Sequence, residues 1–75
     1  MEERVLKVID EINDEIREYD GDNLFEAGLL DSFLAIDLVG ELEEEFDIEI
    51  DAKYVIEENF KTKEAIIALI RKLVS

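Results

Sequence analysis

The sequence predicts an all-α fold, a small helical bundle of three main helices plus one short helix, in a single domain over residues 1–75. Apolar residues recur at helical spacing in three separate segments, with charged residues between them. The chain has no proline and three glycines, although 48% of its residues are hydrophobic. This composition favours helices joined by short polar turns, and a chain of 75 residues can enclose one core.

The first helix is expected close to the amino terminus. Five apolar residues follow helical spacing there, and acidic and basic residues lie between them, as in an amphipathic helix. The pattern stops at Tyr19–Asn23, which reads YDGDN, and no periodicity returns before Asp31. We therefore expect a loop of about a dozen residues, which is long for so small a domain and is a candidate functional segment. The five apolar residues are Val5, Val8, Ile9, Ile12 and Ile16.

The second helix is predicted to run from Ser32 to Phe46. Either Asp31 or Ser32 can cap its start, because both side chains accept hydrogen bonds from the free N–H groups of a first turn. Residues 47–51, which read DIEID, should be extended or irregular. The inward face of the helix is expected to be Leu38, Val39, Leu42 and Phe46.

Two further segments complete the predicted fold. A short helical turn is expected around Ala52–Glu58, with Val55 and Ile56 directed inward. A last helix is predicted from Lys63 to Val74, with Thr62 as its N-cap. The core residues of this helix are expected to be Ile66, Ile67, Ile70, Leu73 and Val74.

The outward face of the second helix combines apolar and acidic side chains. On a helical wheel Phe33 points nearly away from the core, and an apolar patch bordered by carboxylates is typical of a partner-binding surface. Alternatively, Phe33 folds back under the preceding loop, since single exposed apolar residues are common. The candidate partner contacts are Phe33, Ile36, Asp37, Gly40, Glu41 and Glu44.

The charge of the chain limits its partners. Twenty-two Asp and Glu against eight Lys and Arg give a formal net charge of −14, which repels nucleic acids and anionic membrane surfaces. The expected partners are therefore basic proteins, with no nucleic acid and no membrane insertion. Because the amino terminus lacks a signal-peptide core and no apolar run is long enough to span a bilayer, we expect a cytoplasmic protein.

The chain contains no cysteine and no histidine, so self-contained catalysis and a cysteine-based metal site are not expected. Asp20 and Asp22 have the spacing of the first ligands of an EF-hand loop. Leu24 and Asp31 then occupy positions that should hold the third ligand and a glutamate, so a turn is the better interpretation. The acidic run at 41–47 is interpreted as a solvated helix face rather than a cation site.

Ser32 lies where a phosphate ester would meet free N–H groups and the positive end of a helix dipole. From position alone, a capping serine is the commoner role. The stretch GLLDSF, Gly28–Phe33, followed by IDLVGELEEEFDIEI, Ile36–Ile50, resembles the central region of acyl carrier proteins, in which an Asp-Ser pair opens the second helix.

The resemblance implies the acyl carrier protein fold and a 4′-phosphopantetheine group attached to Ser32, with Asp31 used together with the metal of the modifying transferase. The arm would supply the thiol that the chain lacks, and the protein itself would perform no chemistry. The implied partners are a phosphopantetheinyl transferase, an acyl- or aminoacyl-activating ligase, and a downstream acyltransferase or synthase with basic docking patches. A monomer suits such a carrier. Phe33 and Ile36 would be its apolar contacts to these enzymes, and Asp37, Glu41 and Glu44 would meet their basic residues.

Within this family, the stretch LFEAGLLDSF, Leu24–Phe33, is closer to the D-alanyl carriers of teichoic acid modification and to specialised stand-alone carriers than to the carriers of fatty acid synthesis. Phe60 and Lys63, however, stand where the D-alanyl carriers commonly have tryptophan and proline. We therefore expect an acyl or aminoacyl carrier, with a D-alanyl carrier as the alternative. An unmodified acidic helical adaptor that binds basic partners and a small cation-responsive domain are hypotheses from other classes.

Overall fold

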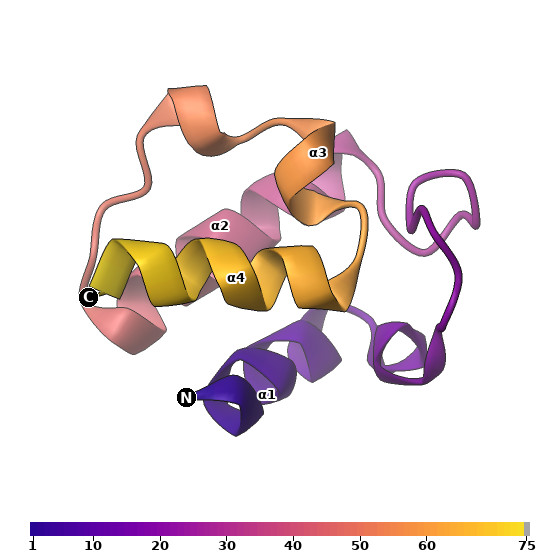
Figure 1. Cartoon of the computed structure of the whole chain (residues 1–75), viewed down its shortest axis with the longest axis horizontal. Helices are drawn as coiled ribbons and strands as arrows, with labels where there is room; N and C mark the ends of the chain where they lie inside the picture. The colour runs from indigo at the N-terminus through magenta and orange to yellow at the C-terminus, as the bar shows by residue number, and fades with distance from the viewer. Residues whose placement is uncertain (75) are drawn as a thin grey trace.

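In the computed structural model, which describes residues 1–74, the chain is all-helical as predicted, with no strand among these residues. Helix α1 packs against both α2 and α4, and α3 packs against α4. In the view of Figure 1, α4 lies in front of α2, α1 lies below them, and the long loop is at the right. The elements are α1 (Glu2–Ile12), the 3₁₀ turn η1 (Asp14–Glu18), α2 (Ser32–Phe46), the 3₁₀ turn η2 (Ala52–Tyr54), the short α3 (Glu57–Phe60) and α4 (Lys63–Val74).

The first amphipathic segment forms two elements rather than the one helix that was expected. Helix α1 ends at Ile12, and Asn13 has an extended backbone with φ −164° and ψ 108°. The Asn13 side chain accepts a hydrogen bond of 3.0 Å from the Glu15 amide, so it caps η1. Ile16 is nevertheless fully buried, because η1 turns it back onto the core.

Helix α2 has the predicted bounds, but its inward face is different in part. Leu38 and Leu42 are fully buried as predicted, and Ala35 is buried with them. Val39 and Phe46 are only partly buried at the edge of the core. The guanidinium group of Arg4, on α1, lies over the Phe46 ring, 4.5 Å from its centroid.

Helix α4 also has the predicted bounds. Thr62 Oγ1 accepts a hydrogen bond of 3.0 Å from the Ala65 amide, which confirms the predicted N-cap. Leu69 is buried although the sequence did not single it out, whereas Val74, expected in the core, lies exposed in the last turn. Of the other expected core residues, Ile66 and Ile70 are buried, and Ile67 and Leu73 are partly buried.

Residues 52–60 depart most from the expectation. The predicted helical turn is replaced by η2 and α3, which are separated by Val55 and Ile56. Val55 is partly buried, but Ile56, expected inward, is 50% exposed. Ile56 has an extended backbone with φ −127° and ψ 155°, so its side chain does not follow a helical wheel. Phe60, at 1% exposure, fills the core instead.

The predicted loop, residues 19–31, is tied to the rest of the fold by side chains and backbone. Leu24 and Leu30 are buried in the core. The Leu24 amide donates a hydrogen bond of 2.6 Å to the carbonyl of Lys61, and Lys63 Nζ donates to the carbonyl of Arg17 in η1 and to that of Tyr19 at the start of the loop. These contacts hold the loop against the start of α4.

Candidate functional site

Ser32 is the first residue of α2, and its side chain is exposed. Asp31 caps the helix, because its Oδ1 accepts a hydrogen bond of 2.9 Å from the Leu34 amide. Within residues 1–74, no hydrogen bond engages the Ser32 hydroxyl. Of the two expected caps, Asp31 is therefore the one in use, and the hydroxyl of Ser32 is available for another role.

The start of α2 suits a phosphate ester. The unpaired N–H groups and the positive dipole end of a helix favour an anionic group. Although the chain carries 22 acidic residues, none lies in the first turn of α2, whereas α1 and α4 both have acidic residues there. The one carboxylate that a phosphate on Ser32 would meet at that turn is therefore the capping carboxylate of Asp31.

A pocket of about 350 Å³ opens beside Ser32, between the start of α2 and residues 55–60. Ser32 and Glu57 are its two polar lining residues, and Glu57 Oε2 accepts a hydrogen bond of 2.7 Å from the side-chain amide of Asn23. We call it the Ser32 pocket. A free hydroxyl, the positive end of a helix and an apolar wall fit the first part of a phosphopantetheine group, in which an anionic phosphate is joined through a methylene to a carbon that bears two methyl groups. The apolar lining is Phe25, Ala35, Ile36, Val55, Ile56 and Phe60.

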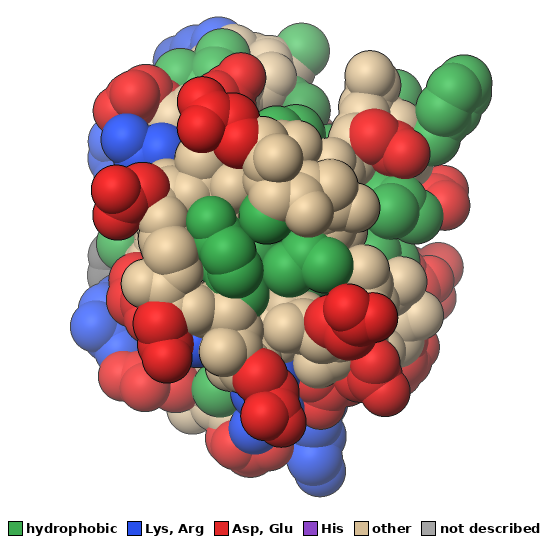
Figure 2. Space-filling model, turned by 90° about the vertical axis from the view of Figure 1, so that its right-hand side faces the viewer, with side chains coloured by type: hydrophobic (Ala, Val, Ile, Leu, Met, Phe, Trp, Pro, Cys, Tyr) green, Lys and Arg blue, Asp and Glu red, His purple; other side chains and the backbone are tan. Residues whose placement is uncertain are grey.

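Exposed apolar side chains gather next to this pocket. Phe33 is 80% exposed and Ile36 64% exposed, so the alternative in which Phe33 folds back under the loop is wrong. Ile56 joins them from the other side of the pocket. The remaining large exposed apolar side chains of residues 1–74, Met1 and Val74, lie at the two ends of the described chain. Figure 2, which views the loop end of the molecule, shows hydrophobic side chains bordered by acidic ones at that end.

The acidic part of the predicted surface is also on the outside. Asp37, Glu41 and Glu44 are exposed on α2, which has no Lys or Arg. Gly40 lies among them on open surface, because a Cβ atom there would meet no atom within 4 Å. A partner can therefore approach the backbone of α2 closely at Gly40.

Two other acids of α2 have roles within the fold. Glu43 Oε2 accepts a hydrogen bond of 2.7 Å from the Ile50 amide and so holds the segment after α2. Glu45 pairs with Arg4 of α1, with 2.9 Å between Oε2 and Nε. The acidic run of α2 therefore includes both outward carboxylates and carboxylates engaged with neighbouring parts of the chain.

The pKa of Glu41 is raised above the ordinary value for glutamate. Loss of solvent around its carboxyl group is the largest cause, followed by the negative charge of Glu11 on α1 and then that of Glu44 on α2. These like charges repel one another, so a positive charge brought by a partner would relieve the repulsion.

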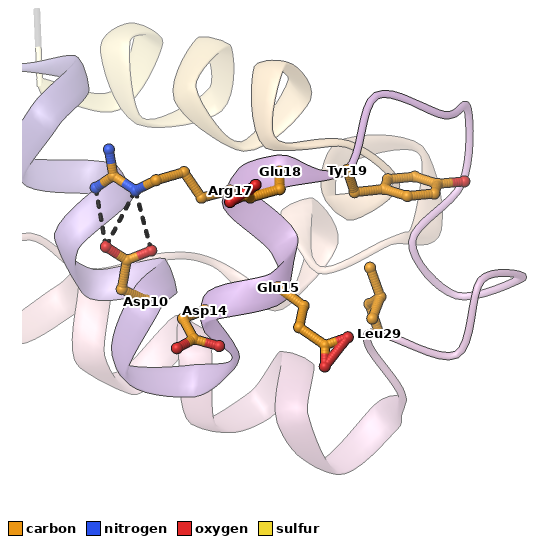
Figure 3. A pocket seen from close by; sticks show the side chains of 7 residues that line it. All are labelled: Asp10, Asp14, Glu15, Arg17, Glu18, Tyr19 and Leu29. Carbon is orange, nitrogen blue, oxygen red and sulfur yellow. Dashed lines mark hydrogen bonds and ion pairs between the residues drawn. The ribbon is translucent and has the colours of Figure 1, made fainter.

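A second and larger pocket, of about 790 Å³, lies at η1 and is shown in Figure 3. Its one basic residue, Arg17, is engaged by Asp10 at 2.9 Å and by Glu3 at 3.0 Å. Tyr19 and Leu29 provide apolar wall, and the other lining residues are acidic. Ser32 does not line this pocket, and none of the predicted site residues does.

The loop residues with EF-hand spacing do not form a metal cluster. Asp20 lies 3.5 Å from the ammonium group of Lys63. Across the described residues 1–74, no group of three or more carboxylate, histidine or cysteine side chains is arranged to hold a metal ion. In the same part of the chain, each helix is too short or too polar to cross a bilayer.

Comparison with known proteins agrees with this geometry. The family model for the phosphopantetheine attachment site matches residues 3–70. The chain belongs to this family. It is a carrier protein whose prosthetic group is a covalently attached 4′-phosphopantetheine, and the implied acyl carrier protein family is thereby confirmed.

Related carrier proteins cover almost the whole chain. The D-alanyl carrier protein of Lactococcus lactis subsp. cremoris (strain MG1363) is 38% identical over 74 residues, which are 96% of this chain and 94% of the relative. The D-alanyl carrier protein of Streptococcus mutans serotype c (strain ATCC 700610 / UA159) is 36% identical over 70 residues, 92% and 89% of the two chains. The D-alanyl carrier protein of Listeria monocytogenes serotype 4b (strain CLIP80459) is 34% identical over 73 residues, which are 95% of this chain and 94% of the relative.

The sequence interpretation of this carrier missed the side of the Ser32 pocket that faces α2. Phe25, Ile56 and Glu57 all line the pocket, yet none of them was a candidate site residue. Asn23 was noted only as part of a turn, although its side chain reaches Glu57. No spacing rule would have found this group, since its members come from a loop and from the segment around α3.

Proposed function

We propose that Ser32 is the attachment residue and that the arm carries an aminoacyl group, D-alanine, as a thioester. The observation that carries the first part is that Ser32 is the single serine within the matched residues 3–70, and its hydroxyl is exposed at the start of α2. The three relatives described above are D-alanyl carrier proteins, which supports the second part.

The two departures from the D-alanyl pattern leave the α2 surface unchanged. Phe60 fills the core, and Lys63 holds the loop through backbone carbonyls. Neither residue belongs to the predicted contacts on α2. We therefore rank D-alanine above other acyl or aminoacyl groups.

In this proposal the chain itself binds and presents, and performs no catalysis. The arm supplies the thiol on which a carboxylic acid is held as a thioester. Ser32 holds the arm, Asp31 keeps the first turn in place, and Phe33, Ile36 and the outward acids of α2 contact basic enzymes. Tethering raises the concentration of the cargo near each docked active site. The enzymes are a phosphopantetheinyl transferase, an aminoacyl-activating ligase and a downstream acyltransferase, and the carrier acts as a cytoplasmic monomer of one domain.

Arm transfer to Ser32 is tested by intact-protein mass. The protein is incubated with coenzyme A, magnesium and a broad-specificity phosphopantetheinyl transferase, with Ser32→Ala run alongside. We expect one phosphopantetheine adduct on the wild type and none on the variant. No adduct on folded wild type would contradict the proposal and favour the unmodified acidic adaptor.

The cargo is tested on the modified protein. Incubation with ATP, an activating ligase of D-alanyl carriers and D-alanine should add one alanyl residue to the mass, and hydroxylamine should remove it, as expected for a thioester. L-alanine and a short fatty acid with its own ligase serve as competitors. Preferential loading of a fatty acyl group would overturn D-alanine as the cargo while leaving Ser32 as the attachment residue.

A further inference from the structure

We propose that Asn23 is a positioning residue, whose side chain holds the start of α3, and with it one wall of the Ser32 pocket, against the loop that leads to Ser32. This inference rests on the proposed function, because the width of the pocket matters to an arm attached at Ser32. It gives a role to a loop residue that the sequence interpretation had treated only as part of a turn.

Two hydrogen bonds tie the loop to α3, one at each end of this short helix. At its start, Asn23 Nδ2 donates a bond of 2.7 Å to Glu57 Oε2. Just after its last residue, the Leu24 amide donates a bond of 2.6 Å to the carbonyl of Lys61, the C-cap. Neighbouring loop residues are therefore bonded to both ends of a helix that has only four residues.

The two ends of α3 are not held equally. At its last residue, Phe60 is buried in the core, and the helix packs against α4. At its start, the N-cap residue Ile56 is half-exposed and provides no side-chain cap. The side chain of Asn59 donates a hydrogen bond to the carbonyl of Tyr54, which lies in the same segment and not in the loop. The start of α3 therefore relies chiefly on the bond to Glu57 for its attachment to the loop.

This weakly held end of α3 borders the Ser32 pocket. Residues 55–57 line the pocket on one side, and Phe25 lines it from the loop. The bond from Asn23 to Glu57 joins these two sides, so its loss would let the start of α3 move relative to the loop and would change the width of the pocket. A bond from an amide to a carboxylate is charge-assisted and is stronger than a bond between neutral groups.

The oxygen of the same side-chain amide serves the loop. Asn23 Oδ1 accepts hydrogen bonds of 2.9 Å and 3.3 Å from the amides of Phe25 and Glu26. One planar amide thus sets the turn of the loop with its oxygen and reaches α3 with its nitrogen. Substitution by aspartate separates the two roles, because it keeps the acceptor and loses the donor.

The experiment combines this substitution with a reciprocal change. Asn23→Asp places one carboxylate against another, whereas Asn23→Asp/Glu57→Gln restores the hydrogen bond with donor and acceptor exchanged and keeps the net charge of the wild type. The matched control is Asn13→Asp, because Asn13 also accepts from the amide two positions along and donates to a loop carbonyl, that of Leu29 at 3.2 Å. Glu57→Ala, which leaves the bonds within the loop in place, gives a second reading if Asn23→Asp does not fold.

Amide hydrogen exchange on the unmodified proteins measures how firmly α3 is held. The probe is the Asn59 amide, which donates to the Ile56 carbonyl at 3.0 Å. Its exchange should rise about tenfold in Asn23→Asp and in Glu57→Ala, and should return to the wild-type rate in the reciprocal variant. It should be unaltered in Asn13→Asp. Unchanged exchange in Asn23→Asp, failure of the reciprocal variant to restore protection, or an equal rise in Asn13→Asp would each overturn the proposal.

The position of the wall relative to the arm is measured on the modified proteins. The NMR cross-relaxation between the two methyl groups of the arm and the Val55 side chain should weaken about twofold or more in Asn23→Asp and recover in the reciprocal variant. A loss of stability alone would not change this signal in the folded protein. No such signal in the wild type, or an equal signal in Asn23→Asp, would overturn the role of Asn23 toward the arm. Arm transfer, read by mass on the wild type, tests the proposed function separately.

Discussion

The carboxylate of Asp31 and the amide of Leu34 are joined by a hydrogen bond of 2.9 Å that spans the first turn of α2. Ser32 and Phe33 lie within this turn, so one capping contact orients both the proposed attachment residue and the largest exposed apolar side chain. The arrangement also explains why the serine is not needed as a cap. An acidic cap and an anionic ester can share the helix end, because several free N–H groups are present there.

Substitution of Asp31 separates capping from charge. Asp31→Ala should lower the free energy of unfolding by about 1 kcal/mol, because one N–H group of the first turn loses its acceptor. Asp31→Asn should retain stability, since asparagine caps equally well, but it should slow arm transfer if the carboxylate meets the metal of the transferase. Urea unfolding and the rate of the mass change measure the two effects. If the Asp31→Asn variant accepted the arm at the wild-type rate, the role of Asp31 would be helix capping alone.

Charge reversal on α2 should weaken docking. With Glu41→Lys and Glu44→Lys together, we expect D-alanine loading at low ionic strength to slow by about tenfold or more, because like charges would face the basic partner. The difference should shrink as salt is added. The charge-matched control is Glu15→Lys with Glu18→Lys, which changes the pocket at η1. Equal slowing by the two double variants would show that net charge, rather than the α2 face, governs loading.

Gly40 offers a test of whether the ligase closely approaches the backbone of α2. Its position on open surface means that alanine fits without a clash, so Gly40→Ala should stabilise the protein by about 0.5–1 kcal/mol through helix propensity. The added methyl group should nevertheless raise the KM for the carrier in the ligase reaction, because it separates the two surfaces. A more stable variant with an unchanged KM would show that the ligase does not approach the backbone there.

The sequence predicted the bounds of the two helices that begin at a clear N-cap. Both α2 and α4 have the bounds that were expected, because their periodic patterns end at clear caps such as Asp31 and Thr62. The outward position of Phe33 was one of two open alternatives, since a helical wheel does not show whether a preceding loop folds over a side chain. Its 80% exposure decides the question.

Other features depended on contacts that periodicity does not encode. Asn13 ends α1 by capping η1, although apolar spacing continues unbroken to Ile16. Ile56 is extended and exposed because it lies between two short helical turns, where no single wheel applies. The Ser32 pocket is therefore a tertiary feature, lined by residues from the loop, the start of α2 and residues 55–60. Whether its residues serve docking stays a prediction.

The raised pKa of Glu41 gives a pH test. The folded protein binds this proton more tightly than the unfolded chain, so the stabilising contribution is complete below the ordinary value of 4.5 and is lost as pH rises through the raised pKa. Glu41→Gln should therefore increase the free energy of unfolding near neutral pH, with little effect in acid. Urea unfolding over a pH series measures this. A destabilised variant at neutral pH would contradict repulsion from Glu11 and Glu44.

Glu3 provides a control, because its pKa is shifted in the opposite direction to that of Glu41. Its pKa is lowered, chiefly by a hydrogen bond from Arg17 and by the charge of that guanidinium. The stabilising contribution is therefore present above 4.5 and is lost as pH falls through the lowered pKa. Glu3→Gln should destabilise the protein near neutral pH, and this loss should diminish in acid. The two variants should thus change stability in opposite directions in one set of measurements.

Replacement of Lys63 should lower the free energy of unfolding more than replacement of any other basic residue of the fold. Its Nζ atom donates hydrogen bonds of 2.7 Å and 2.9 Å to the carbonyls of Arg17 and Tyr19, and its side chain is 15% exposed. The ion pair with Asp20 adds little, because that aspartate is 93% exposed. Lys63→Met keeps the aliphatic stem but leaves two carbonyls without their donor, which should lower the free energy of unfolding by about 1–3 kcal/mol.

The matched control for Lys63→Met is Lys61→Met, since Lys61 pairs only at the surface, with Glu58 at 3.4 Å. Its effect should stay within about 0.5 kcal/mol. Amide hydrogen exchange should also rise across residues 19–31 in Lys63→Met alone, because the loop loses its attachment to α4. A more mobile loop would disturb the start of α2, which follows it directly. Arm transfer to Ser32 should therefore slow as well. Unchanged loop exchange in a destabilised Lys63→Met protein would show that Lys63 supports the core rather than the loop that precedes Ser32.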